Sequence, residues 1–243
     1  MTSRTALVTG SAKRIGAAII RDLHEHGLDV VVHCHHSIDE AKELVAELNE
    51  QRKNSALLVQ GDLLQFKHYK DIIRQALSFK NRLDLLVNNA STFFPTPLGQ
   101  ISEKQWQELI GVNLQAPLFL SQHAAPQLLK NGGSIINMTD IHAAQALKDH
   151  SAYSSAKAGL DMLTRSLARE LAPNVRVNGI ALGAVLWPTH GDEDRKQEVL
   201  AKTALQRTAR LSEVCAAVRF LLDDADYITG QILTLDGGRS RYC

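Results

Sequence analysis

The chain has 243 residues, of which 44% are hydrophobic and 22% charged, and its formal net charge is +1. This composition is typical of a soluble globular protein, and the length suits one domain with a full core. A charge so close to zero excludes strong bulk attraction to nucleic acid or to a membrane surface. No apolar run approaches the roughly 20 residues that a membrane helix needs. We therefore expect neither nucleic acid nor a membrane as a partner.

Strand-like apolar runs alternate with amphipathic segments of helix length along the chain. This alternation predicts an α/β protein: a single-domain, Rossmann-type doubly wound parallel sheet of about seven strands flanked by helices. The expected strands are Thr5–Thr9, Asp29–Cys34, Ala56–Gln60, Leu83–Val87, Ser134–Thr139, Arg176–Ala181 and Ile232–Leu235. The expected helices are Ile15–His26, Asp39–Lys53, Phe66–Lys80, Glu103–Asn131 with an interruption around Asn113, Ser151–Leu171, Asp192–Ala204 and Ser212–Leu222.

No linker or repeat divides the series, so we expect one domain over 1–243. Its nucleotide-binding half is expected at about 1–90 and its catalytic and substrate half at about 91–243. Cys34, Cys215 and Cys243 share no spacing that suggests disulfides or a metal site. The first strand begins at Thr5, which leaves no room for a secretion signal. We expect a cytoplasmic protein.

The first strand is followed by Thr9-Gly-Ser-Ala-Lys-Arg-Ile-Gly16, a loop with two glycines. Glycine permits a tight turn and a close backbone approach, and the N-terminus of the next helix offers unpaired N–H groups to phosphate. Arg14 takes the place of the usual middle glycine, and its side chain could reach a phosphate or a substrate. A plain turn is the alternative interpretation. We expect cofactor contacts from Gly10, Lys13, Arg14, Ile15 and Gly16.

The end of the second strand indicates which nicotinamide nucleotide is used. An acid there binds the ribose hydroxyls of NAD, whereas the 2′-phosphate of NADP needs donors or cations. The chain reads His33-Cys-His-His-Ser37, with no carboxylate before Asp39. His35, His36 and Ser37, with Lys13 and Arg14 nearby, therefore favour NADPH. A metal site is disfavoured, because neighbours in a strand point to opposite faces and could not all converge on one ion.

Two further loops follow strands at the same expected edge of the sheet. In Gly61-Asp-Leu63, Asp62 and Leu63 could border the adenine, although an exposed turn aspartate is an equal alternative. Asn88-Asn-Ala90 follows the fourth strand, and loops at the carboxyl ends of parallel strands belong to the ligand crevice. We expect Asn89 and Ala90 at the cofactor.

Tyr153 and Lys157 lie four residues apart and therefore share one face of a helix. An ammonium beside a phenol stabilises phenolate, so the pair can transfer a proton near neutral pH. A surface Tyr/Lys pair is the alternative for this spacing alone. The nucleotide loop and the Asn-Asn-Ala segment of the same chain favour the catalytic interpretation.

Together these segments resemble the short-chain dehydrogenase/reductase family over essentially the whole chain. The motifs occur in the family's order at Thr9–Gly16, Asn88–Ala90, Asn113, Tyr153 with Lys157, Arg176–Asn178 and Asp236–Gly238. The resemblance implies that Asn113 supports the lysine and a proton-relay water, while a helix break is a compatible role. It also places Gly183 at the cofactor.

A narrower resemblance is to pteridine reductases and bacterial dihydromonapterin/dihydrofolate reductases. It lies in Thr-Gly-x-x-Lys-Arg-x-Gly, His-x-His-x-Ser, the 89–98 segment Asn-Ala-Ser-x-Phe-x-Pro-Thr-Pro-Leu, and an aspartate thirteen residues before the tyrosine. The resemblance implies that Arg14, Ser91 and Phe93 contact a pterin, with the nicotinamide on the other side of its ring. Trp187 lies where the family has its substrate lid, and a lid contact or a core contact remains open. Phe94 is expected to be a packing residue, and His150 a surface histidine.

Asp140 stands where carbonyl-reducing relatives carry a hydroxyl. An ionised carboxylate cannot donate a hydrogen bond and would repel a developing alkoxide, but it can accept bonds from the N–H groups of a pterin. It would also oppose the effect of Lys157 on the Tyr153 pKa. At about 4 Å and an effective dielectric of about 20, each unit charge contributes about 4 kcal/mol. We expect the two effects nearly to cancel and Tyr153 to stay protonated. A capping or turn role is the alternative for Asp140.

The sequence therefore predicts an NADPH-dependent reductase of dihydropterins, and possible use of dihydrofolate, with Asp140, Tyr153, Lys157 and Asn113 as its catalytic group. A carbonyl or 3-ketoacyl reductase of the same family is one alternative, and a catalytically idle NADP(H)-sensing or scaffold protein is another. The substrate contacts are expected from Arg14, Ser91, Phe93, Asp140, Tyr153 and Trp187. The resemblance further implies a homotetramer joined through the helices near Gln115–Lys130 and Ser151–Leu171.

Overall fold

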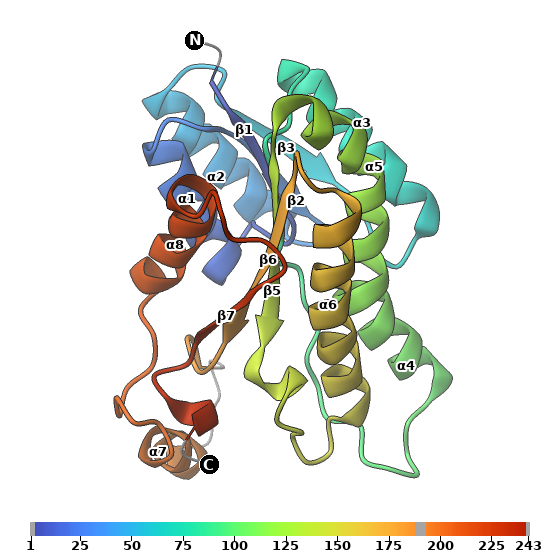
Figure 1. The fold of residues 1–243 in the computed structure, drawn as a ribbon, viewed down its shortest axis with the longest axis vertical. Helices are drawn as coiled ribbons and strands as arrows, with labels where there is room; N and C mark the ends of the chain where they lie inside the picture. The colour runs from blue at the N-terminus through green and yellow to red at the C-terminus, as the bar shows by residue number, and fades with distance from the viewer. Residues whose placement is uncertain (1–2, 188–192, 242–243) are drawn as a thin grey trace.

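The structure is a computed structural model that describes residues 3–187 and 193–241. Seven parallel strands form one sheet in the order β3-β2-β1-β4-β5-β6-β7, with helices on both faces (Figure 1). The strands are β1 Thr5–Val8, β2 Asp29–Cys34, β3 Ala56–Gln60, β4 Leu85–Asn88, β5 Ser134–Asp140, β6 Arg176–Leu182 and β7 Ile232–Leu235. The predicted single-domain, doubly wound parallel sheet is confirmed.

The helices also follow the sequence prediction, with ends shifted by a few residues. They are α1 Arg14–Glu25, α2 Ile38–Gln51, α3 Phe66–Lys80, α4 Glu103–Ile110, α5 Ala116–Asn131, α6 Ser151–Glu170, α7 Glu193–Ala201 and α8 Leu211–Arg219. Short 3-10 turns follow at Ile141–Ala143 and Arg239–Arg241. The expected first residue of α7, Asp192, lies outside the described residues.

The helix predicted over Glu103–Asn131 is interrupted where expected. Residues Gly111–Gln115 form one turn of π-helix between α4 and α5, and Asn113 is fully buried at its centre. A second π-helical turn, Phe220–Asp224, follows α8. Single π turns inside helices are common at functional sites, because the extra residue redirects a side chain.

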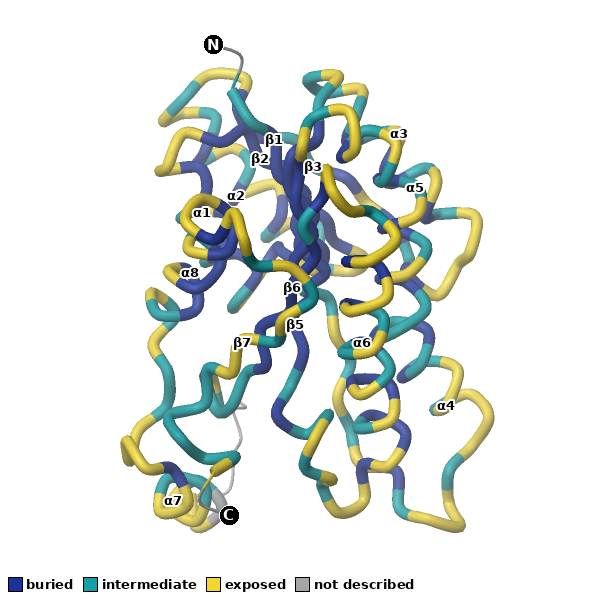
Figure 2. The backbone as a smooth tube through the Cα atoms, viewed as in Figure 1, coloured by how far each residue is buried: buried dark blue, intermediate teal, exposed yellow. Residues whose placement is uncertain are grey.

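Two apolar layers hold the helices to the sheet. On one face α1, α2 and α8 contribute Ile19, Leu44 and Val214, and on the other α3, α5 and α6 contribute Ile72, Leu120 and Leu167. The central strands are dark and buried between these layers in Figure 2, whereas β7 at the edge of the sheet is partly exposed. This double burial explains the near-continuous Val/Ile/Leu runs in the sequence.

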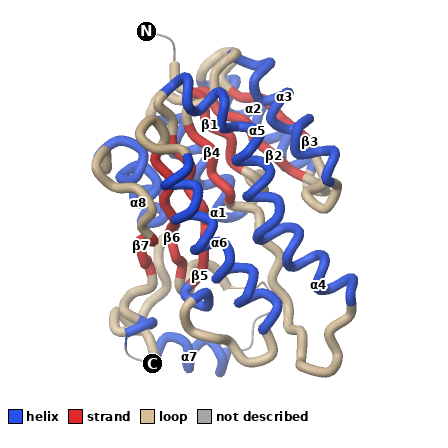
Figure 3. Tube along the Cα trace, turned by 45° about the vertical axis from the view of Figure 1, so that its right-hand side comes forward, coloured by secondary structure: helices blue, strands red, loops and turns tan. Residues whose placement is uncertain are grey.

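Because the strands are parallel, the motifs that follow β1, β2, β3, β4 and β5 lie at one end of the molecule, whereas Arg176–Asn178 begins β6 at the other end. Strand order reverses between β1 and β4, and parallel sheets bind ligands beyond the carboxyl ends of the strands at such a point. Figure 3 shows the loops that follow β5 and β6, the outer end of α4, and α7 gathered at this end. In the part of the chain described here, no helix is long and apolar enough to cross a membrane. No group of three or more His, Cys, Asp or Glu among these residues is arranged to hold a metal.

Candidate active site

A cleft of about 930 Å³ opens at the carboxyl ends of β4, β5 and β6. Ligand pockets in proteins are commonly of this size. Ten of the residues that the sequence predicts for the cofactor or the substrate line it: Arg14, Ile15, Asn89, Ser91, Phe93, Asp140, Tyr153, Lys157, Gly183 and Trp187. Residues from distant parts of the chain therefore meet in one place.

The glycine loop after β1 is built for close backbone contact. Gly10 has φ +59, and a Cβ there would lie 2.9 Å from the Cα of Ala90. A Cβ on Gly16 would lie 2.6 Å from the carbonyl oxygen of Gly10. Both positions therefore require glycine, which supports the cradle interpretation over a plain turn. The space in front of the first turn of α1 suits a diphosphate.

Thr9 and Asn89 connect the loops after β1 and β4. The Thr9 hydroxyl accepts hydrogen bonds from the backbone N–H groups of Asn89 and Ala90, each at 3.0 Å. The side-chain amide of Asn89 donates in return to the carbonyl groups of Thr9 and Gly10. Asn89 thus shapes the glycine loop, a role that the sequence analysis did not assign to it.

The end of β2 carries the expected donors for a 2′-phosphate. His35 and His36 are exposed, with ring centroids 3.6 Å apart and ring planes tilted by 34°, and Ser37 precedes α2. Lys13 forms an ion pair with Glu40 across the surface hollow between α1 and α2. No carboxylate of β2 itself faces this region. These residues therefore fit the 2′-phosphate of NADPH better than the ribose hydroxyls of NAD.

The side chains of Asp62 and Leu63 make contacts within the protein that limit their availability to an adenine ring. The Asp62 carboxylate accepts a bond from the backbone N–H of Leu64 at 2.9 Å and lies 3.8 Å from the ring of His35. The Leu63 side chain is buried in the core below α3. Asp62 therefore forms the turn that was the alternative interpretation.

Asp140 and Tyr153 are in direct contact. The Tyr153 hydroxyl donates to Oδ2 of Asp140 at 2.8 Å, and Oδ1 of Asp140 accepts from the backbone N–H of His142 at 2.8 Å. The carboxylate therefore caps the 3-10 turn after β5 and also faces the phenol. The capping role that was the alternative interpretation is thus present, and the same side chain lines the cleft beside the phenol.

The site keeps Tyr153 protonated. Burial raises the pKa of its phenol, and the charge of Asp140 and the hydrogen bond to it raise that pKa further; the Ser91 hydroxyl acts weakly in the other direction. The expected cancellation between Lys157 and Asp140 is therefore not the cause. The pKa of the phenol is set by burial, Asp140 and Ser91, and not by the charge of Lys157. Its ammonium lies 5.8 Å from the ring centroid. The expected protonation state holds for a different reason.

Lys157 is buried on the same face of α6. Its Nζ donates to the carbonyl oxygen of Met138 at 2.9 Å. Burial lowers the pKa of this lysine to about 8, against the opposing charges of Asp140 and Asp161. Its ammonium thus exchanges protons close to neutral pH.

Asn113 organises the loop after β4. Its amide nitrogen donates to the carbonyl oxygens of Leu109 and Thr92 at 2.9 and 3.0 Å, and its oxygen accepts from the Ser91 hydroxyl at 2.6 Å. The side chain of Asn113 thus bonds Ser91, Thr92 and Leu109, and none of these hydrogen bonds goes to Lys157. A positioning role for Asn113 is therefore visible, whereas support of the lysine stays a prediction.

The two phenylalanines after Asn-Asn-Ala differ as predicted. Phe93 is 52% exposed, and its ring stacks on His150 with centroids 4.6 Å apart and meets Tyr153 edge-on. Phe94 packs against Leu109, Ala152 and Tyr153. Phe93 is thus an aromatic wall of the cleft, held from behind by His150, which the sequence analysis left as a surface histidine.

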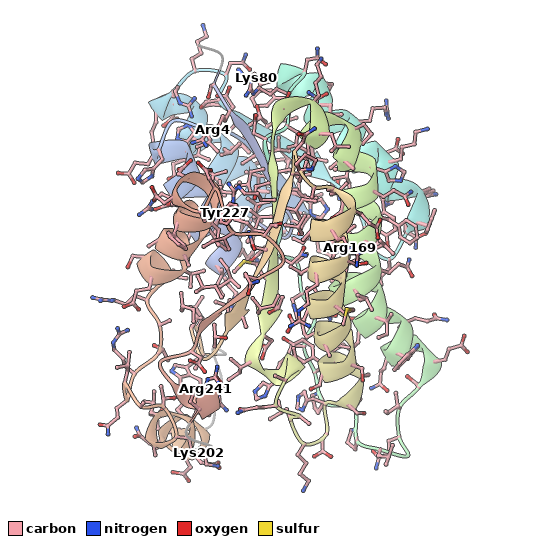
Figure 4. All side chains as sticks on the ribbon, viewed as in Figure 1. Arg4, Lys80, Arg169, Lys202, Tyr227 and Arg241 are labelled. Carbon is pink, nitrogen blue, oxygen red and sulfur yellow. The ribbon has the colours of Figure 1, made fainter. Side chains whose placement is uncertain are left out.

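The outer rim of the cleft comes from the stretch after β6, α7 and the C-terminal turn. Trp187 is partly buried there and lines the cleft, so it faces the ligand space; the following residues 188–192 are outside the described part. Lys202 and Arg241, labelled in Figure 4, both lie toward the lower end of that view. Arg239 lines the cleft from the C-terminal turn.

Comparisons with known proteins agree with this arrangement. The family described as enoyl-(acyl carrier protein) reductase matches residues 10–240. Pteridine reductase 1 of Leishmania tarentolae is 36% identical, over 98% of this chain and 97% of its own length. A 3-oxoacyl-[acyl-carrier-protein] reductase FabG of Staphylococcus epidermidis is 32% identical, over 97% of this chain and 98% of its own.

Among solved structures, FolM alternative dihydrofolate reductase 1 from Brucella canis, complexed with NADP, superposes with a TM-score of 0.89. It is 35% identical to this chain and covers 98% of it, with 94% of its own chain aligned. The chain belongs to the short-chain dehydrogenase/reductase family, and it is an oxidoreductase of that family.

Proposed function

We propose that this protein is an NADPH-dependent pterin reductase, which reduces a dihydropterin, with dihydrofolate as a further candidate, to the tetrahydro form. The observation that carries the proposal is the 2.8 Å contact between the Tyr153 hydroxyl and Asp140 inside the cleft. A carboxylate at this place accepts hydrogen bonds from a nitrogen-rich ring but repels the oxyanion of a ketone reduction.

The names of two similar proteins support the same substrate class. The Leishmania relative is a pteridine reductase, and the Brucella structure is an alternative dihydrofolate reductase holding NADP. The Staphylococcus relative, a 3-oxoacyl reductase, supports the rival function. Asp140 and the exposed ring of Phe93 favour the pterin, because a flat heterocycle can stack on Phe93 while its N–H groups meet the carboxylate.

When bound, NADPH would supply a hydride to the electron-poor carbon of a C=N bond in the dihydropterin. Tyr153 gives a proton to the adjoining nitrogen, directly or through water, so the C=N bond becomes a CH–NH bond. Lys157, on the same helix face, holds the nicotinamide ribose and returns a proton to Tyr153. Asp140 orients the ring and keeps the phenol protonated. The residues proposed to hold the cofactor are those named for it in the sequence analysis. Among them, Lys13, His35, His36 and Ser37 are proposed to bind the 2′-phosphate.

The experiment is a substrate panel with purified protein. NADPH oxidation is followed with dihydrobiopterin, dihydromonapterin, dihydrofolate, a 3-ketoacyl thioester and a simple ketone. Turnover of at least one pterin with a kcat/KM well above that of the ketones is the expected result. Ketone turnover without pterin turnover points to the carbonyl reductase, and NADPH binding without any turnover points to the sensor.

The homotetramer expected from the family stays part of the proposal. On the sequence alone, the small residues Ala152, Ala156, Ala158 and Gly159 suggest close helix approach between subunits at α6. Ala152 and Ala156, two of the small residues in α6, face the core of their own chain, and Gly159 makes room for Leu114. These residues therefore do not mark a contact between subunits. The exposed apolar side chains on α4, α5 and α6 do suit one: Trp106 at 47%, Leu118 at 36% and Met162 at 61% exposure. Light scattering with Met162→Glu tests this face.

A further inference from the structure

One buried histidine has no part in the chemistry proposed above. His33 is the fifth residue of β2 and only 1% exposed. Its neighbours His35 and His36 lie in the solvent, so it does not belong to the cluster that the sequence suggests. A buried imidazole that keeps two hydrogen bonds in the interior must satisfy both ring nitrogens there.

Both nitrogens of His33 are bonded to backbone groups of different loops. The N–H of Gly10 donates to Nδ1 at 3.1 Å, and Nε2 lies 3.1 Å from the carbonyl oxygen of Gly61. Gly10 belongs to the loop after β1, and Gly61 begins the loop after β3. The ring therefore spans β2 and joins the two loops that flank it.

These partners fix the proton on the ring. A backbone N–H can only donate, so Nδ1 must be unprotonated; a carbonyl oxygen can only accept, so Nε2 must carry the hydrogen. A second proton would place two N–H groups against each other at Gly10. Burial lowers the pKa of His33 to about 4, with the nearby His35 acting in the same direction. The ring is therefore neutral at physiological pH.

The backbone of His33 holds the same loop from a second direction. Its N–H donates to the Ser11 hydroxyl at 3.1 Å, and its carbonyl accepts from the Ser11 N–H at 2.9 Å. Ser11 in turn donates to the carbonyl of Val8 at 2.7 Å. The glycine loop is thus fixed to β2 through Ser11, and the loop of Gly61 is fixed to β2 by the bond from the Gly61 N–H to the Cys34 carbonyl at 3.0 Å. The imidazole of His33 adds a side-chain link that contacts both loops.

We propose that His33 is a positioning residue that sets the spacing between the loops at Gly10 and Gly61 and thereby the affinity for the adenosine diphosphate half of the cofactor. The inference rests on the proposed use of NADPH. The loop at Gly10 borders the expected diphosphate position, and the loop at Gly61 leads into Asp62 beside the expected adenine. Since His33 reaches neither the nicotinamide nor Tyr153, it acts on binding and not on proton transfer.

The test compares His33→Asn and His33→Leu with the wild type. Asparagine can still accept from Gly10 but cannot reach Gly61, whereas leucine loses both bonds. We expect Kd for NADPH and for adenosine 2′,5′-bisphosphate to rise about tenfold with leucine and less with asparagine, since about 1.4 kcal/mol corresponds to tenfold. The kcat and the KM for the pterin should change less than twofold.

His24→Asn is the matched control. His24 is likewise a buried histidine with a hydrogen bond, at 2.7 Å to Ser55, but it lies near the far end of α1. It should lower thermal stability without changing nucleotide affinity. Unchanged affinity in both His33 variants, or a fall in kcat equal to the loss of affinity, overturns the proposal.

A measurement on the wild type does not depend on the variants folding. Nitrogen-15 NMR of the imidazole should show the hydrogen on Nε2 and an unprotonated Nδ1 at neutral pH. A hydrogen on Nδ1 contradicts the bond to Gly10 and overturns the proposal. Failure of the wild type to bind NADPH would instead contradict the proposed function, so the two failures are distinguishable.

Discussion

The Tyr153 hydroxyl and the Asp140 carboxylate lie 2.8 Å apart, and the phenol is the donor. The second oxygen of Asp140 is held by the backbone of the turn that follows β5. Both oxygens of the carboxylate are therefore held by hydrogen bonds, and its orientation does not depend on a bound ligand. The Asp140 carboxylate, an acceptor, and the Tyr153 hydroxyl, a donor, thus line the cleft side by side in a fixed geometry.

Replacing Asp140 should redirect substrate preference. Asp140→Ser removes the charge that disfavours an oxyanion and supplies a donor. We expect kcat/KM for the pterin to fall about 10- to 100-fold, since hydrogen bonds to a charged group contribute about 1.5–3 kcal/mol. Turnover of a ketone should rise or first become measurable. Steady-state kinetics with both substrates checks this, and an unchanged ratio of the two kcat/KM values contradicts it.

Removing the phenol oxygen should separate binding from chemistry. In Tyr153→Phe the ring still packs against Phe94 and Leu109, so the fold and the affinity for NADPH should be retained. We expect kcat to fall about 10²- to 10⁴-fold, the usual contribution of a general acid. Rapid-mixing kinetics of hydride transfer is the measurement. Tyr227→Phe is the control, because Tyr227 is fully exposed and distant from the cleft.

The buried lysine predicts an alkaline limit to activity. The ammonium form of Lys157 is required in the proposed proton transfer, and burial lowers the pKa of this side chain to about 8. The active form is present below that pH and is lost as the pH rises through it. The kcat/KM for the pterin should therefore decrease above about pH 8. A profile that stays flat to pH 10 argues against a protonated lysine.

Lys13 should discriminate between the two nicotinamide cofactors. Its ammonium lies next to the expected 2′-phosphate and is paired with Glu40 at the surface. Lys13→Ala should raise the KM for NADPH about three- to tenfold, since an exposed ionic contact contributes about 1 kcal/mol, and leave the KM for NADH unchanged. Lys42→Ala, which alters another exposed lysine near Asp39, is the control. Equal effects on both cofactors place Lys13 away from the 2′-phosphate.

Acid should destabilise the fold through His33. Burial lowers the pKa of its ring from 6.5 in the unfolded chain to about 4, so between these values the unfolded state binds the extra proton. The stability that this residue contributes is complete above about pH 6.5 and is lost as the pH falls to about 4, a difference of roughly 3 kcal/mol. Urea unfolding across this range, with His33→Leu for comparison, measures it. The variant should show a correspondingly smaller pH dependence.

The sequence predicts the fold well, because a doubly wound sheet requires apolar strand segments that alternate with amphipathic helices, and both are visible in the sequence. Strands buried on both faces are almost entirely apolar, which is the case for β1, β2 and β4. The alternation of strand-like and helix-like segments located the other strands, including the more exposed β7. Helix ends were less certain: α2 begins at Ile38 and not at Asp39, since a terminal residue is only weakly specified by composition. The break at Asn113 was found because the family motif marks it.

The site was only partly predictable. Spacing alone placed Tyr153 and Lys157 on one helix face, and the motifs brought Asp140 and Phe93 to the same cleft. The contribution of His33, of Thr9 and of His150 was missed, because each acts through contacts with residues distant in the sequence. The pKa of Tyr153 could not be derived either, since burial is the main cause and a sequence gives no measure of it.

Arg14 adopts φ +54, a conformation that suits glycine far better than arginine. Its side chain lines the cleft. A glycine substitution here would relax the backbone and yield a protein that resists heat at least as well, yet recognises its ligands less well. The loop thus has a lower thermal stability than it would have with glycine, in return for a side chain that contacts the ligand. A search for more thermotolerant variants of this enzyme should therefore leave position 14 unchanged.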